Sequence, residues 1–317
     1  MYLALLSGKN IEMAKEEIFS ISSGFKETKL DGRVVVFDSR KAPDFSLLGL
    51  THEAGTFLGK NIEEVDFTVF LSQNIQISVL NLDSEQNSLL FSKKIGEFIS
   101  KKGLKVDFKS RDILRVYLTK GCAYFTKPVF VQDKKEFAKR ASPKRKFFMP
   151  TSIDSMVARA LVNIAGAKKG VTVLDPFCGS GGLLLEAAAV GVEVFGCDIE
   201  EKCVKGTIGN LEQFGYLVTA VTSDAMNVKK VFKNKFDCVV ADLPFGKSSK
   251  ILKDKQKLYK EFLYYVPELV KKNGRVVIGC DEEKLDYPKK EFILENKFSI
   301  YIHKSMTRHF FVFKAMS

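Results

Sequence analysis

From residue 153 onward, the chain alternates short apolar runs with longer amphipathic runs, and this alternation restricts the fold more than any other feature. The apolar runs predict strands at Val171–Leu174, Glu193–Cys197, Leu217–Thr222, Phe236–Ala241 and Arg275–Gly279. The other runs predict helices at Ile153–Ala165, Gly182–Val190, Glu201–Phe214, Ala225–Phe232 and Lys255–Lys271. Such alternation is typical of a doubly wound, mostly parallel sheet. Two closing strands, Phe298–His303 and Arg308–Phe313, predict an antiparallel hairpin at the edge of that sheet.

Carboxylates stand at the ends of successive predicted strands. Asp175 and Asp198 close the first two strands, Asp224 follows the third and Asp242 closes the fourth. Because the carboxyl ends of parallel strands meet at one edge of a sheet, we expect these four side chains to lie close together, at the edge where such sheets bind ligands. A single acid at a strand end is common and needs no function, so only the set of four indicates a site.

The first strand leads into a loop of small residues that opens the next helix. The loop consists of Asp175, Pro176, Phe177, Cys178, Gly179, Ser180, Gly181 and Gly182. Glycines let the backbone approach a ligand, and the helix directs its N–H groups at it. The dinucleotide fingerprint G-x-G-x-x-G, counted from Gly179, needs a glycine where this chain has Leu184, and an acidic strand end does not suit a pyrophosphate. A dehydrogenase is therefore disfavoured.

An acidic strand end suits a cationic, amine-bearing ligand instead. S-Adenosyl-L-methionine carries a sulfonium and an α-amino group, so we expect the loop from Asp175 to Gly182 to hold its methionine end. Phe177 and Cys178 are expected to line this pocket, with core packing as their alternative role.

The adenosine part of the same ligand needs acceptors farther along the sheet edge. Asp198, followed by Ile199, stands where a carboxylate accepts hydrogen bonds from ribose hydroxyls. Asp224, followed by Ala225, stands where a carboxylate would accept from the adenine amine. Neither a metal ion nor a covalent intermediate is expected in the chemistry.

The fourth strand ends in an acidic, proline-containing turn that suits a planar base with an exocyclic amine. Such an amine is a poor nucleophile, and Asp242 and the carbonyl of Leu243 could accept its two hydrogens. Pro244 restricts the backbone, and Phe245 offers a ring on which an unstacked base can lie. Taken alone, these residues fit an ordinary strand end running into a turn better, and only the rest of the chain favours the base-binding interpretation. The residues after it, which could hold the target phosphate or form a solvated loop, are Lys247, Ser248 and Ser249.

The net charge of +12 is concentrated in one segment. Residues 93–146 contain 17 basic and 5 acidic side chains, whereas residues 1–92 contain 8 basic and 13 acidic ones. Aromatic residues are interleaved with the lysines and arginines, a mixture that suits phosphates and unstacked bases. A solvated lysine-rich surface is the alternative interpretation.

The region before residue 127 predicts an α+β fold with helices on one face of an antiparallel sheet. Helices are expected at Asn10–Ser23 and Ser88–Lys102. Between them, the sequence predicts a helix at Phe45–Leu58 and a strand at Phe67–Leu71. Residues Lys127–Pro150, rich in proline and basic side chains, are typical of a connector.

Composition limits the cellular setting. The amino terminus lacks the features of a signal peptide, and no apolar run reaches membrane-spanning length. The six cysteines form no C-x-x-C pair and are expected to be reduced core residues, which predicts a cytoplasmic protein with neither a zinc site nor disulfides.

In residues 147–317 the motifs DPFCGSGG, CDIEE, SDAMN and ADLPFG occur in that order, and this part resembles a Rossmann-fold S-adenosylmethionine-dependent N-methyltransferase. The preceding segment KVDFKSRDILRVYLTKGCAYFTK is similar to a THUMP domain, an RNA-binding module. With FFMPTSIDSMVARALVNIA and the ending IHKSMTRHFFVFK, nearly the whole chain resembles the archaeal tRNA guanosine-10 N2-methyltransferase family.

The resemblance implies four parts. These are a ferredoxin-like subdomain at 1–48, a THUMP domain at 49–128, a basic linker at 129–150 and the methyltransferase domain at 151–317. It also implies that the THUMP domain and the basic segment 93–146 grip the 3′ end of tRNA. Resemblance to eukaryotic relatives allows a small activating subunit.

Two departures from the family pattern leave the target nucleoside open. Asp242, Leu243, Pro244 and Phe245 replace the more usual Asp-Pro-Pro-Tyr and are closer to the related enzymes that act on guanosine 6 of tRNA. Met149 stands where a histidine commonly precedes the proline. The sequence also allows a DNA or rRNA amino-methyltransferase and, less readily, a non-catalytic RNA-binding protein.

Overall fold

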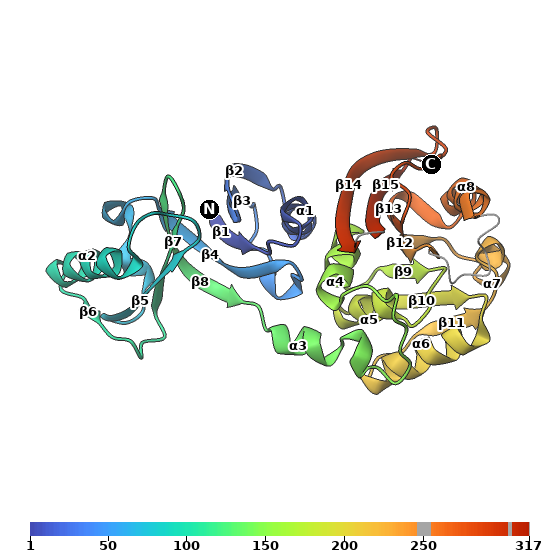
Figure 1. Cartoon of the computed structure of the whole chain (residues 1–317), viewed down its shortest axis with the longest axis horizontal. Coiled ribbons are helices and arrows are strands. Elements are labelled where there is room, and N and C mark those ends of the chain that lie inside the picture. The colour runs from blue at the N-terminus through green and yellow to red at the C-terminus, as the bar shows by residue number, and fades with distance from the viewer. Residues whose placement is uncertain (246–254, 304–305, 317) are drawn as a thin grey trace. The chain divides into compact units, whose positions relative to one another are not determined.

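The computed structural model describes residues 1–245, 255–303 and 306–316, which form two compact units (Figure 1). The first unit contains residues 1–11, 22–46 and 51–132. The second contains residues 12–21, 47–50 and 133–317. The chain therefore enters the second unit twice before its main carboxyl-terminal part begins.

The second unit is built on a seven-stranded sheet with the order β11-β10-β9-β12-β13-β15-β14. The strands are β9 (Thr172–Asp175), β10 (Glu193–Asp198), β11 (Thr219–Thr222), β12 (Phe236–Asp242), β13 (Val270–Cys280), β14 (Phe292–His303) and β15 (Met306–Ala315). The first five strands in this order are parallel, and β15 and β14 are antiparallel to their neighbours. This confirms the predicted class I methyltransferase fold with its carboxyl-terminal hairpin.

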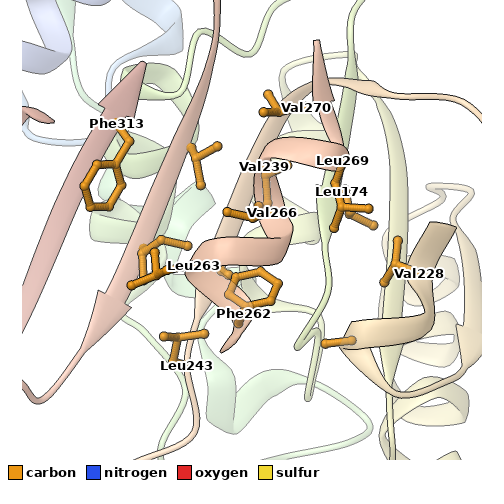
Figure 2. Close-up of a cluster of buried hydrophobic side chains, with 14 of the residues drawn as sticks. Leu174, Val228, Val239, Leu243, Phe262, Leu263, Val266, Leu269, Val270 and Phe313 are labelled. Atoms are coloured by element: carbon orange, nitrogen blue, oxygen red, sulfur yellow. The ribbon is translucent and has the colours of Figure 1, made fainter. Parts of the chain in front are cut away.

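Helices cover both faces of this sheet (Figure 1). They are α4 (Ser155–Ile164), α5 (Gly182–Ala189), α6 (Glu201–Gln213), α7 (Val228–Val231) and α8 (Lys255–Tyr265). On the face of α7 and α8, Val228, Phe262 and Leu263 pack with strand residues such as Val239 and Phe313 into one buried cluster (Figure 2). The helix predicted to reach Lys271 is too long, because β13 already begins at Val270.

The first unit contains an eight-stranded sheet with the order β2-β3-β1-β4-β8-β7-β5-β6. The strands are β1 (Tyr2–Leu6), β2 (Lys26–Asp31), β3 (Val34–Asp38), β4 (Thr51–Gly59), β5 (Asn74–Asn81), β6 (Lys105–Val106), β7 (Ile113–Leu118) and β8 (Ala123–Val131). Most pairs are antiparallel, but β5 is parallel to β6 and β7. Helix α2 (Ser88–Lys101) buries Ile95 and Ile99 against this sheet, as its apolar pattern predicts.

Two local predictions in the first unit are wrong. The helix expected at Phe45–Leu58 is mostly β4, which lies between β1 and β8; Gly55 is needed there, since a Cβ would come within 2.1 Å of the Lys127 carbonyl oxygen. The strand expected at Phe67–Leu71 is a 3₁₀ turn, η3 (Phe67–Val69), whose first turn is capped by the Asp66 side chain.

The expected connector also has regular structure. Residues 127–131 belong to β8, and α3 (Lys134–Lys139) and η4 (Ser142–Lys144) follow. In the second unit, Arg140 and Arg159 both pair with Glu186, which is fully buried in α5. Opposite charges compensate one another here, as buried charges require.

The amino-terminal helix α1 (Ile11–Ile21) belongs almost entirely to the second unit. Its Glu17 is fully buried and accepts hydrogen bonds from the backbone N–H groups of Gly49 and Leu50 and from the Asn163 side chain, at 2.6–2.8 Å. Burial raises the pKa of Glu17 to about 7, although these donors and Arg159 lower it. Three chain segments therefore meet at one carboxyl group.

Within the described residues, no helix is long and apolar enough to cross a membrane, and no cluster of three or more metal-ligating side chains occurs. The six cysteines are free thiols, five of them buried.

Candidate active site

Three of the four predicted acids lie close together at the carboxyl edge of the parallel strands. Asp175 ends β9, Asp198 ends β10 and Asp242 ends β12. Burial raises the pKa of Asp175 well above its usual range, and the charges of Asp242 and Asp198 raise it further. Such a group of mutually repelling carboxylates in a buried setting favours a cationic ligand.

Asp224 lies farther along the same edge. It follows β11, and its exposed side chain caps η5 (Ala225–Asn227) by accepting from the Met226 N–H at 2.8 Å. The preceding Ser223 N–H donates to the Asp198 carbonyl, which ties the ends of β10 and β11 together. Ala225 is buried, whereas Ile199 is 67% exposed, so these two neighbours have different surroundings.

The loop after β9 is held in shape by backbone and side-chain hydrogen bonds. The Asp175 carboxylate accepts from the Phe177 N–H at 3.0 Å, and Asp198 accepts from the Gly179 N–H at 2.9 Å. Gly181 is the N-cap residue of α5 and has a φ of 74°, a left-handed conformation that favours glycine, and a Cβ there would lie 2.9 Å from Thr207. The small residues of this loop are thus required by its geometry.

The aromatic and sulfur side chains of the loop have different environments. Cys178 is buried, accepts a hydrogen bond from Thr207, and has a pKa raised by burial, so it packs into the interior of the unit. Phe177 is partly buried and meets Phe262 edge to face, with ring centroids 5.0 Å apart. The Pro176 carbonyl accepts from the Cys197 thiol.

The segment expected as a linker, residues 129–150, and the residues directly after it pack on this loop. The Ser152 and Ser180 hydroxyls are 2.9 Å apart. A Cβ on Gly179 would lie 3.6 Å from the Met149 sulfur, and one on Gly182 would lie 2.9 Å from Arg145 Nη1. These neighbours were not predicted as site residues, although the resemblance of FFMPTS to the family was a signal for Met149 and Ser152.

The catalytic turn predicted at the end of β12 is supported from three sides. Leu243 is fully buried beside Phe262 and Leu263 (Figure 2), and its N–H donates to the Gly279 carbonyl at 2.8 Å. The hydroxyl of Tyr259 in α8 donates to the Pro244 carbonyl at 2.8 Å. Tyr259 also contacts Asp281, which pairs with Lys255. The backbone of the turn is therefore fixed before any substrate arrives.

Asp242 has one oxygen that the described residues do not satisfy. Its Oδ1 atom is buried and has no hydrogen-bond partner among them. Burial raises the pKa of Asp242 to about 6; Arg308 lowers it and Asp281 raises it. Gly279, opposite Asp242 in the sheet, leaves room for Oδ1, because a Cβ there would approach this atom to 2.6 Å. A buried, unsatisfied acceptor in a fixed frame is suited to bind a donor.

Arg308 is a further site residue that was not predicted from the sequence. It lies in β15 and is 6% exposed. Its Nη2 atom is 3.4 Å from Asp242 Oδ2 and donates to the Thr151 carbonyl at 3.0 Å. Its guanidinium carbon lies 4.4 Å from the centre of the Phe245 ring. Arg308 thus contacts two predicted catalytic residues at once.

Lys247, Ser248 and Ser249, predicted as candidates for holding the target phosphate, lie outside the described residues together with Gly246.

Comparisons with known proteins agree with the fold of the second unit. An RMKL-like methyltransferase domain matches residues 143–287, and a DNA methylase family matches residues 56–209. TrmN from Thermus thermophilus shares the fold with a TM-score of 0.56 and 20% sequence identity, over 99% of both chains.

Relatives of known name extend over most of the sequence. The tRNA (guanine(10)-N2)-dimethyltransferase of Methanocaldococcus jannaschii is 34% identical, with 77% of this chain and 71% of that protein covered. The enzyme of the same name from Pyrococcus abyssi is 28% identical over 99% of this chain and 100% of its own length. These similarities confirm the resemblance drawn from the sequence motifs: the chain belongs to the tRNA (guanine(10)-N2)-dimethyltransferase family.

Proposed function

We propose that this chain transfers methyl groups from S-adenosyl-L-methionine to the exocyclic N2 amine of guanosine in tRNA, with guanosine 10 as the target. Family membership supports the reaction class. The single observation that supports the site is the buried Asp242 Oδ1 atom, which has no partner among the described residues and lies beside a stabilised aromatic turn. An amine donor would satisfy it.

The residues at the sheet edge fit the cofactor. Asp175 would face its cationic methionine part, because burial and neighbouring carboxylates make this position favourable for positive charge. Each Asp198 oxygen accepts one backbone N–H, from Gly179 or Glu200, and keeps a second lone pair for a ribose hydroxyl. Asp224 would accept from the adenine amine. When bound, the cofactor supplies an electrophilic methyl group on its sulfonium.

The turn at the end of β12 would hold the base. Asp242 Oδ1 and the Leu243 carbonyl would accept the two amine hydrogens, and Phe245 would stack on the ring. The amine nitrogen is then directed at the methyl group, and the developing positive charge on nitrogen is stabilised by the acceptors. Tyr259 and Gly279 act indirectly, since they fix the backbone and leave space for Asp242.

The exposed basic side chains of the first unit would bind the tRNA backbone. Within segment 93–146 they are Lys93, Lys94, Lys101, Lys102, Lys105, Lys109, Arg111 and Lys120. Phe108, which is 80% exposed among them, offers a stacking surface for an unpaired base. Arg140 and Arg145 are buried and are thus removed from the predicted basic surface. We propose that residues 49–128 form a THUMP domain and that this surface grips the 3′ end of tRNA, away from the modified base.

The test is to incubate the purified chain with tRNA and S-adenosyl-L-methionine, digest the tRNA, and map the product by mass spectrometry. We expect N2-methylguanosine and N2,N2-dimethylguanosine at position 10. Methylation at position 6 would favour the related guanosine-6 enzymes, and methylation of DNA or rRNA in place of tRNA would favour a DNA or rRNA amino-methyltransferase. Cofactor binding without methyl transfer by the chain alone would indicate a missing activating subunit or a non-catalytic RNA-binding protein.

Removing the 3′-terminal nucleotides of the tRNA tests the proposed anchor. We expect the full chain to lose most of its activity on this shortened tRNA, because the distance from the 3′ end would select the target nucleotide. Equal activity on both tRNAs would contradict the proposed anchor at the 3′ end, but it would not contradict the proposed methylation reaction.

We also propose a cytoplasmic location. The free thiols of the six cysteines support it, because thiols stay reduced in that compartment.

A further inference from the structure

Arg308 has a combination of contacts that the methyl-transfer scheme does not use. Its guanidinium is paired with Asp242 Oδ2, anchored to the Thr151 carbonyl and laid against the Phe245 ring. The guanidinium Nε atom is buried and has no partner among the described residues. Burying such a group has an energetic cost, and the three contacts only partly compensate it.

Several charged or titratable groups face Asp242 from the elements packed around it. Asp175 comes from β9, Tyr259 from α8, and Cys280 and Asp281 from the end of β13. All of them are either neutral or negative when Asp242 ionises. In the described part of the site, Arg308 from β15 is the cation that opposes the effect of burial on the Asp242 pKa.

The ionisation state of Asp242 matters for base recognition. An ionised carboxylate only accepts hydrogen bonds, whereas a protonated one also donates. On the Watson–Crick side of guanine, the N2 amine lies next to N1–H, so these two neighbouring groups both donate. The amines of adenine and cytosine lie next to a ring nitrogen that accepts. An ionised carboxylate therefore attracts the guanine edge and repels the other two.

We propose that Arg308 is a positioning and specificity residue, which keeps Asp242 an acceptor-only carboxylate and thereby makes the site select guanine. The cation–π contact with Phe245 orders the stacking ring at the same time, so one side chain aligns both the acceptor and the platform. This inference rests on the proposed methylation of guanosine.

The experiment uses the full chain, saturating S-adenosyl-L-methionine and two tRNAs, one with guanine and one with 2-aminopurine at the target position. 2-Aminopurine keeps the exocyclic amine, but its N1 is an unprotonated acceptor and it lacks the O6 carbonyl. We expect wild-type kcat/KM to be higher for guanine by about tenfold or more, the scale of one well-placed pair of hydrogen bonds. In Arg308→Met this preference should largely disappear, and in Arg308→Lys most of it should remain.

The pH profile separates this role from a purely structural one. In Arg308→Met the acid limb of kcat should move to higher pH by about one unit or more, because an opposite charge at this distance is removed. Arg275→Met, which also removes a paired arginine from the sheet, should leave the limb in place. A uniform loss of kcat in Arg308→Met, with an unchanged acid limb and unchanged base preference, would overturn the proposal.

A measurement on the wild-type protein tests the link between Asp242 ionisation and guanine preference, even if the Arg308→Met variant does not fold. The guanine preference should fall as the pH is lowered through the acid limb, because protonated Asp242 accumulates. A preference that stays constant while the rate falls would contradict the inference. Methylation of another atom of the base, or of DNA or rRNA in place of tRNA, would instead refute the proposed function.

Discussion

At the scale of single residues, Asp242 carries the sharpest prediction. Asp242→Ala removes an oriented acceptor from a buried site, so kcat should fall by at least about a hundredfold while cofactor affinity stays nearly constant. Single-turnover methylation and calorimetry measure the two quantities. Asp237→Asn is the control, since Asp237 lies at the opposite end of β12 and pairs with Lys271 and Thr172. Near wild-type turnover in Asp242→Ala would exclude Asp242 from the chemistry.

Asp175 makes cofactor binding sensitive to protons. Its pKa is raised by burial and by nearby carboxylates, so a cation beside it should lower this pKa and release protons. Calorimetric titrations of S-adenosyl-L-methionine in buffers of different ionisation enthalpy should detect this release. In Asp175→Asn the release should decrease markedly. An equal proton release in both proteins would show that another group responds to the ligand.

At the scale of elements, the spacing between β12 and β13 determines where Asp242 points. A Cβ at Gly279 would lie 2.6 Å from Asp242 Oδ1 and 2.9 Å from the Phe310 ring. Gly279→Ala should therefore displace the carboxylate and lower kcat by about tenfold or more with cofactor affinity retained. Gly209→Ala in α6 is the matched control, because a Cβ there meets nothing within 4 Å. Comparable activity of both variants would show that the site tolerates the displacement.

Helix α1 is tied to the second unit by Glu17. Glu17→Ala leaves the buried N–H groups of Gly49 and Leu50 and the Asn163 amide without their acceptor, and should lower the free energy of unfolding by about 3 kcal/mol or more. Glu12→Ala, which breaks only an exposed pair with Lys15, should have little effect. Urea denaturation measures both. Equal stability of the two variants would mean that water replaces the lost acceptor.

The parallel sheet was predictable because each of its strands has a local apolar signal and ends at an acid or a turn. The loop that contains Gly179 and Gly181 was also predictable, because its run of small residues directly follows the strand that ends at Asp175. Arg308 was not, since nothing in its local sequence shows that β15 brings it to Asp242. The wrong helix at Phe45–Leu58 has a similar cause: pairing on both sides of β4 outweighs a weak local pattern. The helix at Asn10–Ser23 was predicted, but the sequence did not show to which unit it belongs.

At the scale of the whole molecule, RNA binding and catalysis should respond to different substitutions. Replacing Lys102, Lys105 and Lys109 together by alanine should weaken tRNA binding and reduce its salt dependence by about 0.7–0.9 in log–log slope for each lost phosphate contact. Cofactor affinity and kcat at saturating tRNA should stay the same. Replacing the exposed Lys284, Lys289 and Lys290 of the second unit is the control. A similar loss in both triple variants would argue against a dedicated RNA surface in the first unit.

The burial of Glu17 against Asn163 also determines when the protein can finish folding during synthesis. These residues are 146 positions apart, so α1 leaves the ribosome long before its partner α4 exists. Until then, Glu17 lacks its Asn163 partner and the second unit cannot be completed, and incompletely folded states of this kind are prone to aggregation. The same arrangement predicts the result of cutting the chain once, after Gln132. The two fragments should stay associated under native conditions, because residues 12–21 and 47–50 of the first fragment are structural parts of the second unit.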